Sequence, residues 1–313
     1  MINKLALKAV FENSLKLKPN ESCLIITDTI EEEIAKYFFD YAYKISPNSH
    51  IEVMEPLNEH GQEPPKKISD LMLKYDVELL ITNKSLTHTK ARRDATSKGV
   101  RIASMPMVTE DIINRCLDID YENLRKKSIQ LKNILFKAKK IKIITDLGTN
   151  IIFEIGNREI DIDDGILDSK CAFGNLPAGE VDFSPINSNG IYIVDASFPT
   201  FGKLNSPLTF YVSNGLVTKI IGKNSKELIS NLNKIGKNAY IIAELGIGIN
   251  PKAKIIGNVL EDEKVLGTCH IAIGNNVFYG GSNDVPIHLD GVITKPTIYV
   301  DGKKVMEKGL HLF

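Results

Sequence analysis

The chain lacks an excess of charge of either sign. Lysine and arginine together number 39, and aspartate and glutamate also number 39, so the formal net charge at pH 7 is zero. A protein that binds nucleic acid or anionic lipid through displaced counterions needs a basic surface. We therefore expect no nucleic-acid partner and no membrane partner, and we expect a small-molecule or peptide substrate.

Cysteine is scarce, and the chain has no cysteine pair with the spacing of a metal or redox motif. The only cysteines are Cys23, Cys116, Cys171 and Cys269, and no CxxC occurs. Free, widely spaced thiols are typical of a reducing compartment. The N-terminal residues also lack a continuous apolar stretch with a cleavage site, and no later apolar run is long enough to span a bilayer. We therefore expect a cytoplasmic protein.

Glycine motifs that bind phosphate are missing as well. The first apolar segment, CLIITD at 23–28, is followed by TIEEE, whose acidic side chains would repel a pyrophosphate. No GxxxxGK[ST] sequence occurs anywhere in the chain. These absences disfavour nucleotide binding.

What the first part of the chain does contain is a regular alternation of short apolar and amphipathic segments. Examples are the apolar stretches 23–28 and 51–56, which flank a helical pattern over 31–45. This rhythm predicts βαβ units and a mainly parallel sheet covered on both faces. A longer helix is predicted over 121–140. We expect an α/β domain over residues 1–139.

Strands and turns dominate after that helix. Of the 22 glycines, 18 lie beyond residue 156, where tight turns and close backbone approaches need them. The pairs Asn214-Gly215 and Asp301-Gly302 predict tight hairpin turns. We expect residues 140–313 to form a β-rich α+β domain that contains the chemistry.

Three side chains of metal-ligand type lie near the C-terminus. His288 and Asp290 form an HxD pair in IHLDGV, and His270 lies in GTCHIAIG. Residues i and i+2 of a strand share a face, so both members of the pair can reach one ion. Two imidazoles and one carboxylate suit a divalent first-row metal, in a hydrolytic site or as the facial triad of a non-haem iron oxygenase. By itself, an HxD pair is more often a surface strand pair.

Two glutamates extend this set. Glu180 follows a tight Pro-Gly turn in NLPAGEV, and Glu244 ends an apolar run in IIAEL, where a carboxylate is costly unless it is paired or bound to a cation. Each also has an ordinary interpretation, Glu180 as a solvated loop acid and Glu244 as part of a buried salt bridge. With the three residues near the C-terminus, they give enough potential ligands for two metal ions.

Four separated motifs resemble those of a known family. NLPAGEV, AELGIGINP, GNVLEDEKVLGTCHIAIG and IHLDGVI are similar, in this order, to motifs of the aminopeptidase T/aminopeptidase S metallopeptidase family. A looser likeness in the first domain runs through SLTHTKARRDATSKGVRIASMP. The resemblance implies a homodimer and one or two divalent ions per chain, zinc, cobalt or manganese. The ligands that it implies are Glu180, Glu244, His270, His288 and Asp290.

The chain departs from the peptidase pattern at two positions. Gly179 precedes Glu180 where the peptidases have a second glutamate. Val277 stands where they have a site tyrosine, and the nearest tyrosine is Tyr279, a candidate pocket residue. The related 2,5-dihydroxypyridine 5,6-dioxygenases fit these departures, since they bind a single Fe(II) with two histidines and one carboxylate. That resemblance implies His270, His288 and Asp290 as the iron ligands.

Two further features remain open. His88, in SLTHTKARR, is expected to line a pocket and bind a substrate carboxylate, or else to lie in solvent at the start of a helix. The acidic run at 261–263 is expected to form a solvated turn, with the alternative that Glu263 accepts an imidazole N–H from His270.

The resemblance predicts a metallo-aminopeptidase, a hydrolase in which a metal-activated water attacks the peptide bond and Glu180 is a ligand or the general base. The alternative is a mononuclear Fe(II) ring-cleaving dioxygenase with open coordination positions for substrate and O₂. A non-catalytic protein with a structural metal is a third class, disfavoured because structural zinc sites are usually closed with cysteine ligands.

Overall fold

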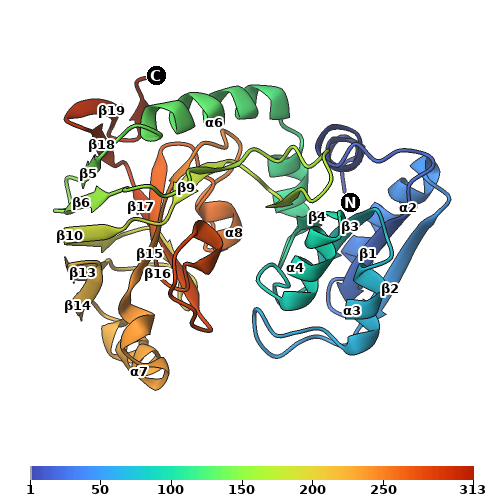
Figure 1. The fold of residues 1–313 in the computed structure, drawn as a ribbon, viewed down its shortest axis with the longest axis horizontal. Helices are drawn as coiled ribbons and strands as arrows, with labels where there is room; N and C mark the ends of the chain where they lie inside the picture. Colours follow the sequence, from blue (N-terminus) through green and yellow to red (C-terminus); the bar gives the residue numbers. More distant parts are fainter. Residues whose placement is uncertain (1) are drawn as a thin grey trace. The chain divides into compact units, whose positions relative to one another are not determined.

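The computed structural model describes residues 2–313, which divide into two compact units. The N-terminal unit contains the residues up to Arg125 and the segment Asp163–Ala178, and the C-terminal unit contains Lys126–Ile162 and Gly179–Phe313 (Figure 1). The division differs from the expected boundary after residue 139. The helix beyond residue 125 belongs to the C-terminal unit, and 163–178 returns to the N-terminal unit because a strand in it extends that unit's sheet.

A five-stranded parallel sheet organises the N-terminal unit, which confirms the predicted α/β fold with a mainly parallel sheet. Every residue of two adjacent inner strands, Cys23–Asp28 and Val77–Ile81, is buried, as expected for strands covered on both faces. In sheet order the strands are β2 (Ser49–Met54), β1 (Cys23–Asp28), β3 (Val77–Ile81), β4 (Arg101–Ser104) and β8 (Phe173–Asn175).

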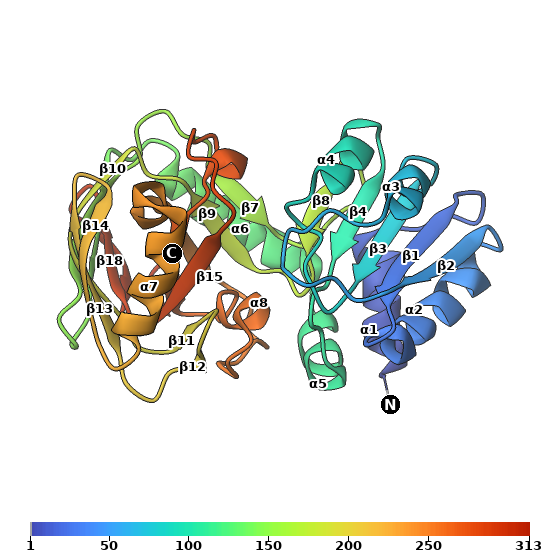
Figure 2. The same ribbon diagram turned by 90° about the horizontal axis from the view of Figure 1, so that it is seen from below.

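Helices cover both faces of this sheet, α3 and α4 on one face and α1 and α2 on the other (Figure 2). On the first face, Leu24, Leu80 and Ile102 of the strands pack with Ile68 of α3 and Ala95 of α4. Burial of a large aliphatic side chain contributes roughly 1.5–3 kcal/mol, so this layer is a main source of the unit's stability. The helices of this unit are α1 (Lys4–Lys8), α2 (Glu32–Ile45), α3 (Lys66–Met72), α4 (Lys90–Ser97) and α5 (Glu110–Ile112), and α6 (Tyr121–Leu135) begins in it and continues into the C-terminal unit.

Two mainly antiparallel sheets form the C-terminal unit, as predicted for a β-rich α+β domain. The first has the order β14-β13-β10-β6-β5-β18-β19-β20 and the second β12-β11-β17-β16-β15-β9-β7. The strands of the first are β5 (Lys140–Ile144), β6 (Asn150–Glu154), β10 (Asn187–Val194), β13 (Leu208–Ser213), β14 (Leu216–Ile221), β18 (Thr297–Val300), β19 (Lys303–Glu307) and β20 (Leu310–His311). Those of the second are β7 (Asp161–Asp163), β9 (Glu180–Phe183), β11 (Ser197–Phe198), β12 (Gly202–Lys203), β15 (Ile242–Gly248), β16 (Thr268–Gly274) and β17 (His288–Thr294).

Apolar side chains join these two sheets. The Phe210 ring of β13 lies 4.5 Å from the Tyr192 ring of β10 and 6.0 Å from the Phe198 ring of β11, centroid to centroid. A Cβ at Gly291 of β17 would lie 2.5 Å from Val194 of β10, so glycine permits the close approach of the two sheets. One face of the second sheet is therefore committed to the core, and its other face is available for a site.

The predicted hairpin turns are confirmed. Asn214 and Gly215 connect β13 and β14 with φ of 51° and 73°, and Asp301 and Gly302 connect β18 and β19 with φ of 46° and 82°. Positive φ at both central residues is what a type I′ turn requires. Besides most of α6, the helices of this unit are α7 (Ser225–Ile235) and the short α8 (Val259–Asp262). Among residues 2–313, no helix combines the length and the apolar character needed to cross a bilayer.

Candidate metal centre

Four neighbouring strands of the second sheet bring the predicted ligands together. In sheet order, β17 contains His288 and Asp290, β16 contains His270, β15 contains Glu244, and β9 contains Glu180. Their side chains share one face because of the strand period of two: Ala272 of β16 pairs with Glu244 on one side and with Asp290 on the other. Cys269 and Ile271, the neighbours of His270 in β16, are fully buried and by the same period point to the opposite face, toward the core.

Glycine makes room for an imidazole at the centre of this face. Gly246 of β15 pairs with His270 of β16, and a Cβ at Gly246 would lie 2.1 Å from both Cε1 and Nε2 of His270. The imidazole therefore lies directly over the β15 backbone, a position that any larger residue at 246 would obstruct. His270 is 1% exposed there, and its orientation is fixed by backbone rather than by a mobile side chain.

The nitrogen and oxygen atoms of these side chains converge. His270 Nε2 lies 3.2 Å from Glu244 Oε1 and 3.5 Å from Glu180 Oε2. His288 Nε2 lies 2.9 Å from Glu244 Oε2 and 3.2 Å from Asp290 Oδ1. One ligand atom from each of Glu244, His270 and Asp290 falls within 4.8 Å of the others, a spacing that can hold one ion. The structure thus brings together the five residues that the sequence singled out.

The tautomer of His288 favours a metal ligand. Its Nδ1 lies 2.7 Å from the carbonyl oxygen of Asn275, so Nδ1–H donates this hydrogen bond. A histidine held in this way presents the lone pair of Nε2 to a metal, and the backbone contact fixes the ring orientation. The Tyr279 ring flanks the imidazole, with 5.5 Å between ring centroids. The tyrosine at 279 therefore lies at the cluster, whereas Val277 is 47% exposed.

Several atoms of the cluster lack a hydrogen bond, and this tests whether a cation fits. Among the described residues 2–313, His270 Nδ1 and Asp182 Oδ1 are buried without a hydrogen-bond partner, whereas Glu244 Oε2, Asp290 Oδ1 and Glu180 Oε2 face histidine Nε2 atoms at 2.9, 3.2 and 3.5 Å without a regular hydrogen bond. An unsatisfied buried polar group costs about 1–3 kcal/mol, and more if it is charged. Carboxylate oxygens and imidazole nitrogens that face one another are well suited to a divalent first-row ion.

Charge coupling within the cluster is strong. Burial by itself lowers the pKa of His270, but the hydrogen bond to Glu244 and the nearby Glu180 raise it to about 9. Burial likewise lowers the pKa of His288, and Asp290 and Glu244 raise it well above its usual value. Burial raises the pKa of Glu244, yet the two histidines lower it below its usual range. Carboxylates and imidazoles thus favour each other's charged forms here, and a metal that binds the imidazole nitrogens would compete with protons for them.

Sequence reasoning missed two members of this cluster, Asp182 and Lys264. Asp182 of β9 shares a face with Glu180, and a strand period of two could have identified it. Burial, with Glu244 and Glu180 nearby, raises its pKa well above the usual value. Lys264 is 0% exposed and forms ion pairs with Glu180 and Glu263. No sequence periodicity could have identified Lys264, because it lies in the loop between α8 and β16.

The expected solvated turn at 261–263 is wrong. Glu261 and Asp262 are fully buried, and Glu263 is 9% exposed. Glu261 Oε1 accepts a hydrogen bond from the Lys254 amide at 2.6 Å, and Asp262 accepts hydrogen bonds from two further backbone amides of the same loop. The carboxylates replace water as acceptors for a folded-over loop, since buried backbone amides need partners. Burial raises the pKa of Glu263 to about 8.

Two other residues have plain local explanations. Gly179 has φ of 130°, and a Cβ there would lie 2.7 Å from Cβ of Asn250, so no glutamate fits next to Glu180. His88 is exposed in the N-terminal unit, just before α4, whose N-cap is Thr89. Its backbone oxygen accepts a hydrogen bond from Arg93 at 2.7 Å. A role for His88 in substrate binding stays a prediction.

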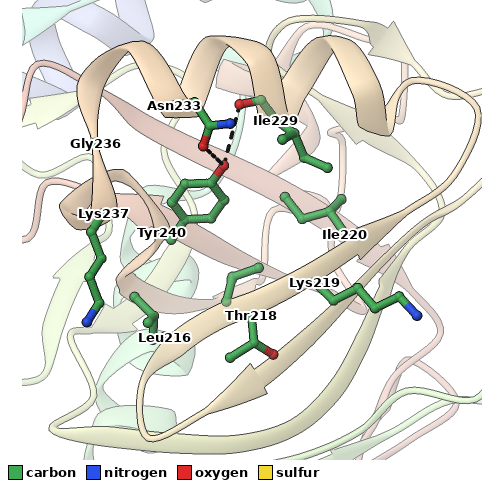
Figure 3. A pocket seen from close by; sticks show the side chains of 10 residues that line it. Leu216, Thr218, Lys219, Ile220, Ile229, Asn233, Gly236, Lys237 and Tyr240 are labelled. Atoms are coloured by element: carbon green, nitrogen blue, oxygen red, sulfur yellow. Dashed lines mark hydrogen bonds between the residues drawn. The ribbon is translucent and has the colours of Figure 1, made fainter.

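A separate cavity of about 400 Å³ lies between β14 and α7. Figure 3 shows Tyr240 and Asn233 at one end of it and Lys219 and Thr218 at the other. The Tyr240 hydroxyl donates to Asn233 Oδ1 at 2.7 Å. None of the five predicted ligands lines this cavity, so it is distinct from the metal cluster.

Comparisons with known proteins separate the two functions that the sequence left open. The family model described as 2,5-dihydroxypyridine 5,6-dioxygenase matches residues 7–312. The 2,5-dihydroxypyridine 5,6-dioxygenase of Pseudomonas putida is 21% identical over 248 residues, which cover 74% of this chain and 70% of that protein.

Solved structures give the same fold. The 2,5-dihydroxypyridine dioxygenase of Pseudomonas putida KT2440 superposes with a TM-score of 0.85 at 16% identity, over 98% of this chain and 96% of that one. AmpT from Thermus thermophilus superposes with a TM-score of 0.74 at 14% identity, over 99% of this chain and 98% of that one. At these identities the likeness shows a shared fold alone.

The expected assignment as a metallo-aminopeptidase, and with it the description as a hydrolase and metalloprotease, is wrong. The family match and the curated relative are dioxygenases, and the likeness to AmpT extends to the fold only. In this chain the four motifs lie on or next to β9, β15, β16 and β17, in a sheet of a fold that both solved structures share, so they predict the sheet and did not choose between peptide hydrolysis and ring cleavage. The chain belongs to the 2,5-dihydroxypyridine 5,6-dioxygenase family.

Proposed function

We propose that this chain is a mononuclear non-haem Fe(II) dioxygenase that opens the ring of a hydroxylated pyridine. The observation that carries the proposal is the family match over residues 7–312. The convergence of two imidazoles and a carboxylate supports it, because this ligand set is typical of non-haem Fe(II) oxygenases. The substrate class follows from the name of the family and of its Pseudomonas relative.

His270, His288 and Asp290 would be the iron ligands. The carbonyl of Asn275 holds His288 in the tautomer with its proton on Nδ1, which leaves Nε2 free to bind iron. Gly246 leaves space for the ring of His270. Glu244 contacts both imidazoles and would keep them directed at one point. Two carboxylates, two neutral imidazoles and one divalent ion form a neutral group, which a buried site tolerates far better than a net charge.

Iron would supply open coordination positions and the redox chemistry that lets dioxygen react with a closed-shell ring. The chain's own residues would position the substrate and exclude water. Tyr279 presents an aromatic ring beside His288, where it can contact a planar heterocycle. The sheet face itself is closed by buried side chains around Glu244, which is 2% exposed.

The remaining expectations stay proposals that solution experiments can check. The homodimer implied by resemblance would appear as a doubled mass in light scattering, and the cytoplasmic location would appear on fractionation of cells that express the protein. The peptidase resemblance implied zinc, cobalt or manganese. Under the present proposal, protein purified without air should instead contain a single iron per chain.

Oxygen uptake tests the proposed function. Anaerobically purified protein, reconstituted with Fe(II), should consume dioxygen and 2,5-dihydroxypyridine in equal amounts, with loss of the ring's ultraviolet absorbance. His288→Ala should abolish uptake while far-UV circular dichroism is retained. The matched control is His50→Ala, which removes a half-exposed histidine of the N-terminal unit that pairs with Glu52 at 3.3 Å and stacks on the Tyr75 ring, remote in sequence from the ligands. Iron-loaded protein that leaves hydroxypyridines intact, or an active His288→Ala variant, would refute the proposal.

A further inference from the structure

A fully buried lysine lies beside the candidate iron ligands. Lys264 is 0% exposed, although lysine is among the residue types least often buried. Its ammonium group donates to Glu180 Oε1 and lies 2.8 Å from Glu263 Oε1. Both carboxylates are themselves buried, at 8% and 9% exposure. Removing a lysine head group from water is costly, so this placement needs an explanation in terms of what it binds.

The ammonium occupies a second group of potential ligands. Glu180, Glu263 and His270 offer atoms that all lie within 4.8 Å of one another, which is the spacing of a metal site. This group shares His270 with the first one, and Glu180 Oε2 lies 3.5 Å from His270 Nε2. Two-metal sites place their ions about 3.5–4 Å apart with ligands that lie between the ions. The second group is therefore located where a second ion would bind.

The backbone around Lys264 is built to hold it there. Gly248 of β15 admits the passing loop, since a Cβ at Gly248 would lie 2.3 Å from the carbonyl oxygen of Val265 and 2.8 Å from that of Glu263. The Asn250 amide donates to the Lys264 carbonyl at 2.8 Å, and Asn250 also pairs with Val265 in a parallel bridge. These contacts fix the base of the lysine side chain against the sheet that contains the ligands.

We infer that Lys264 takes the place of a second metal ion and so restricts the centre to one metal per chain. The inference rests on the proposed function, and it names the residue that limits the number of metal ions bound at the centre. Its ammonium satisfies Glu180 and Glu263 with one positive charge, and it repels a divalent ion at the distances that a metal pair requires. Glu180 is then a partner of Lys264 rather than a metal ligand, which leaves His270 free to serve the single ion.

Metal counting on two neutral variants tests this inference. Lys264→Met removes the charge and keeps the length, and Lys264→Gln keeps hydrogen-bond donors without charge. Metal-free protein is titrated with Mn²⁺, and bound ions are counted from the loss of the free-ion EPR signal. We expect saturation at about one Mn²⁺ per chain in the parent and about two in each variant, with spin coupling between the two ions. Lys254→Met, at an exposed lysine of the same loop, is the matched control and should stay at about one.

The outcomes separate the inference from the function on which it rests. Variants that saturate at the parental one ion overturn the role of Lys264 and leave the dioxygenase proposal intact. A parent chain that binds two ions overturns both the inference and the mononuclear centre. If a variant fails to fold without metal, refolding it with Mn²⁺ decides the matter: a fold with two ions per chain supports the inference, and no fold, or one ion, overturns it.

Discussion

Gly246→Ala should separate metal binding from folding in this protein. The substituted Cβ would lie 2.1 Å from Cε1 and Nε2 of His270, whereas non-bonded carbon atoms normally keep about 3.5 Å apart. The imidazole must therefore move by about 1.4 Å, because β15 and β16 are held in register by neighbouring strands on both sides. A ligand set tolerates displacements of only about 0.5 Å before it loses its function.

The size of the effect follows from this displacement. Disturbance of the groups that orient a metal ligand typically costs 10–100-fold in metal affinity, about 1.4–2.7 kcal/mol, and loss of a first ligand costs more. We therefore expect the affinity of Gly246→Ala for Fe(II), or for Mn²⁺ as a probe, to fall by at least about 100-fold. Overpacking of the buried face should lower the free energy of unfolding by about 1–3 kcal/mol.

Two measurements decide the outcome, Mn²⁺ affinity by calorimetry and unfolding by urea, both on metal-free protein. Cys269→Ala is the contrasting variant, because Cys269 is adjacent to His270 and buried on the opposite face of β16. It should lower stability by a similar amount and leave the affinity within about threefold of the parent. Parental affinity in Gly246→Ala would refute the claim that glycine is needed to seat His270 as a ligand.

Two further predictions concern the N-terminal unit. Arg101→Leu should lower the free energy of unfolding by about 3 kcal/mol in urea at pH 7, since Arg101 pairs with Glu21 through two 2.8 Å contacts while only 7% of its side chain is exposed. The hydrogen bond from Arg101 lowers the pKa of Glu21, so this stabilisation is present above the usual carboxyl pKa of 4.5 and is lost as pH falls through the lower, folded value. A loss that is the same at pH 7 and pH 3 would contradict this. Glu78→Leu should stabilise the fold by roughly 1–3 kcal/mol, because both Glu78 oxygens are buried without a hydrogen bond among residues 2–313. Burial raises the pKa of Glu78, so its cost grows as pH rises above 4.5, and the gain from Leu in thermal unfolding should be larger at pH 8 than at pH 5; an equal gain would count against it.

Much of the site could be predicted because strands repeat every two residues. HxD in a strand places His288 and Asp290 on one face, and an apolar run that ends in Glu244 indicates a carboxylate that needs a partner. The parallel sheet of the N-terminal unit follows from the alternation of apolar and amphipathic segments in the same way. Each of these patterns is local and can be recognised in a short stretch of sequence.

What could not be predicted depends on contacts distant in sequence. Lys264 and Glu180 are 84 residues apart, and their ion pair exists only because Gly248 lets a loop lie against β15. The run at 261–263 has the composition of a solvated turn, yet all three side chains are buried. Glu261 and Asp262 accept hydrogen bonds from backbone amides of the same loop, which replace water. The choice between peptidase and dioxygenase failed because the motifs lie on or next to strands of one sheet, and the fold that contains this sheet is shared with a solved structure of each kind.

The return of the segment Asp163–Ala178 to the N-terminal unit has a consequence for how the chain is made. Strand β8 completes the parallel sheet at the edge of β4, so that sheet stays unfinished until residue 175 has been synthesised. By then β5 and β6 of the other unit have already emerged, and β9 with Glu180 follows within a few residues. Neither unit is a contiguous stretch of sequence, so neither can be separated from the other by a single cut. A fragment ending at residue 139 would therefore lack β8 and leave β4 as an open edge able to pair with other chains.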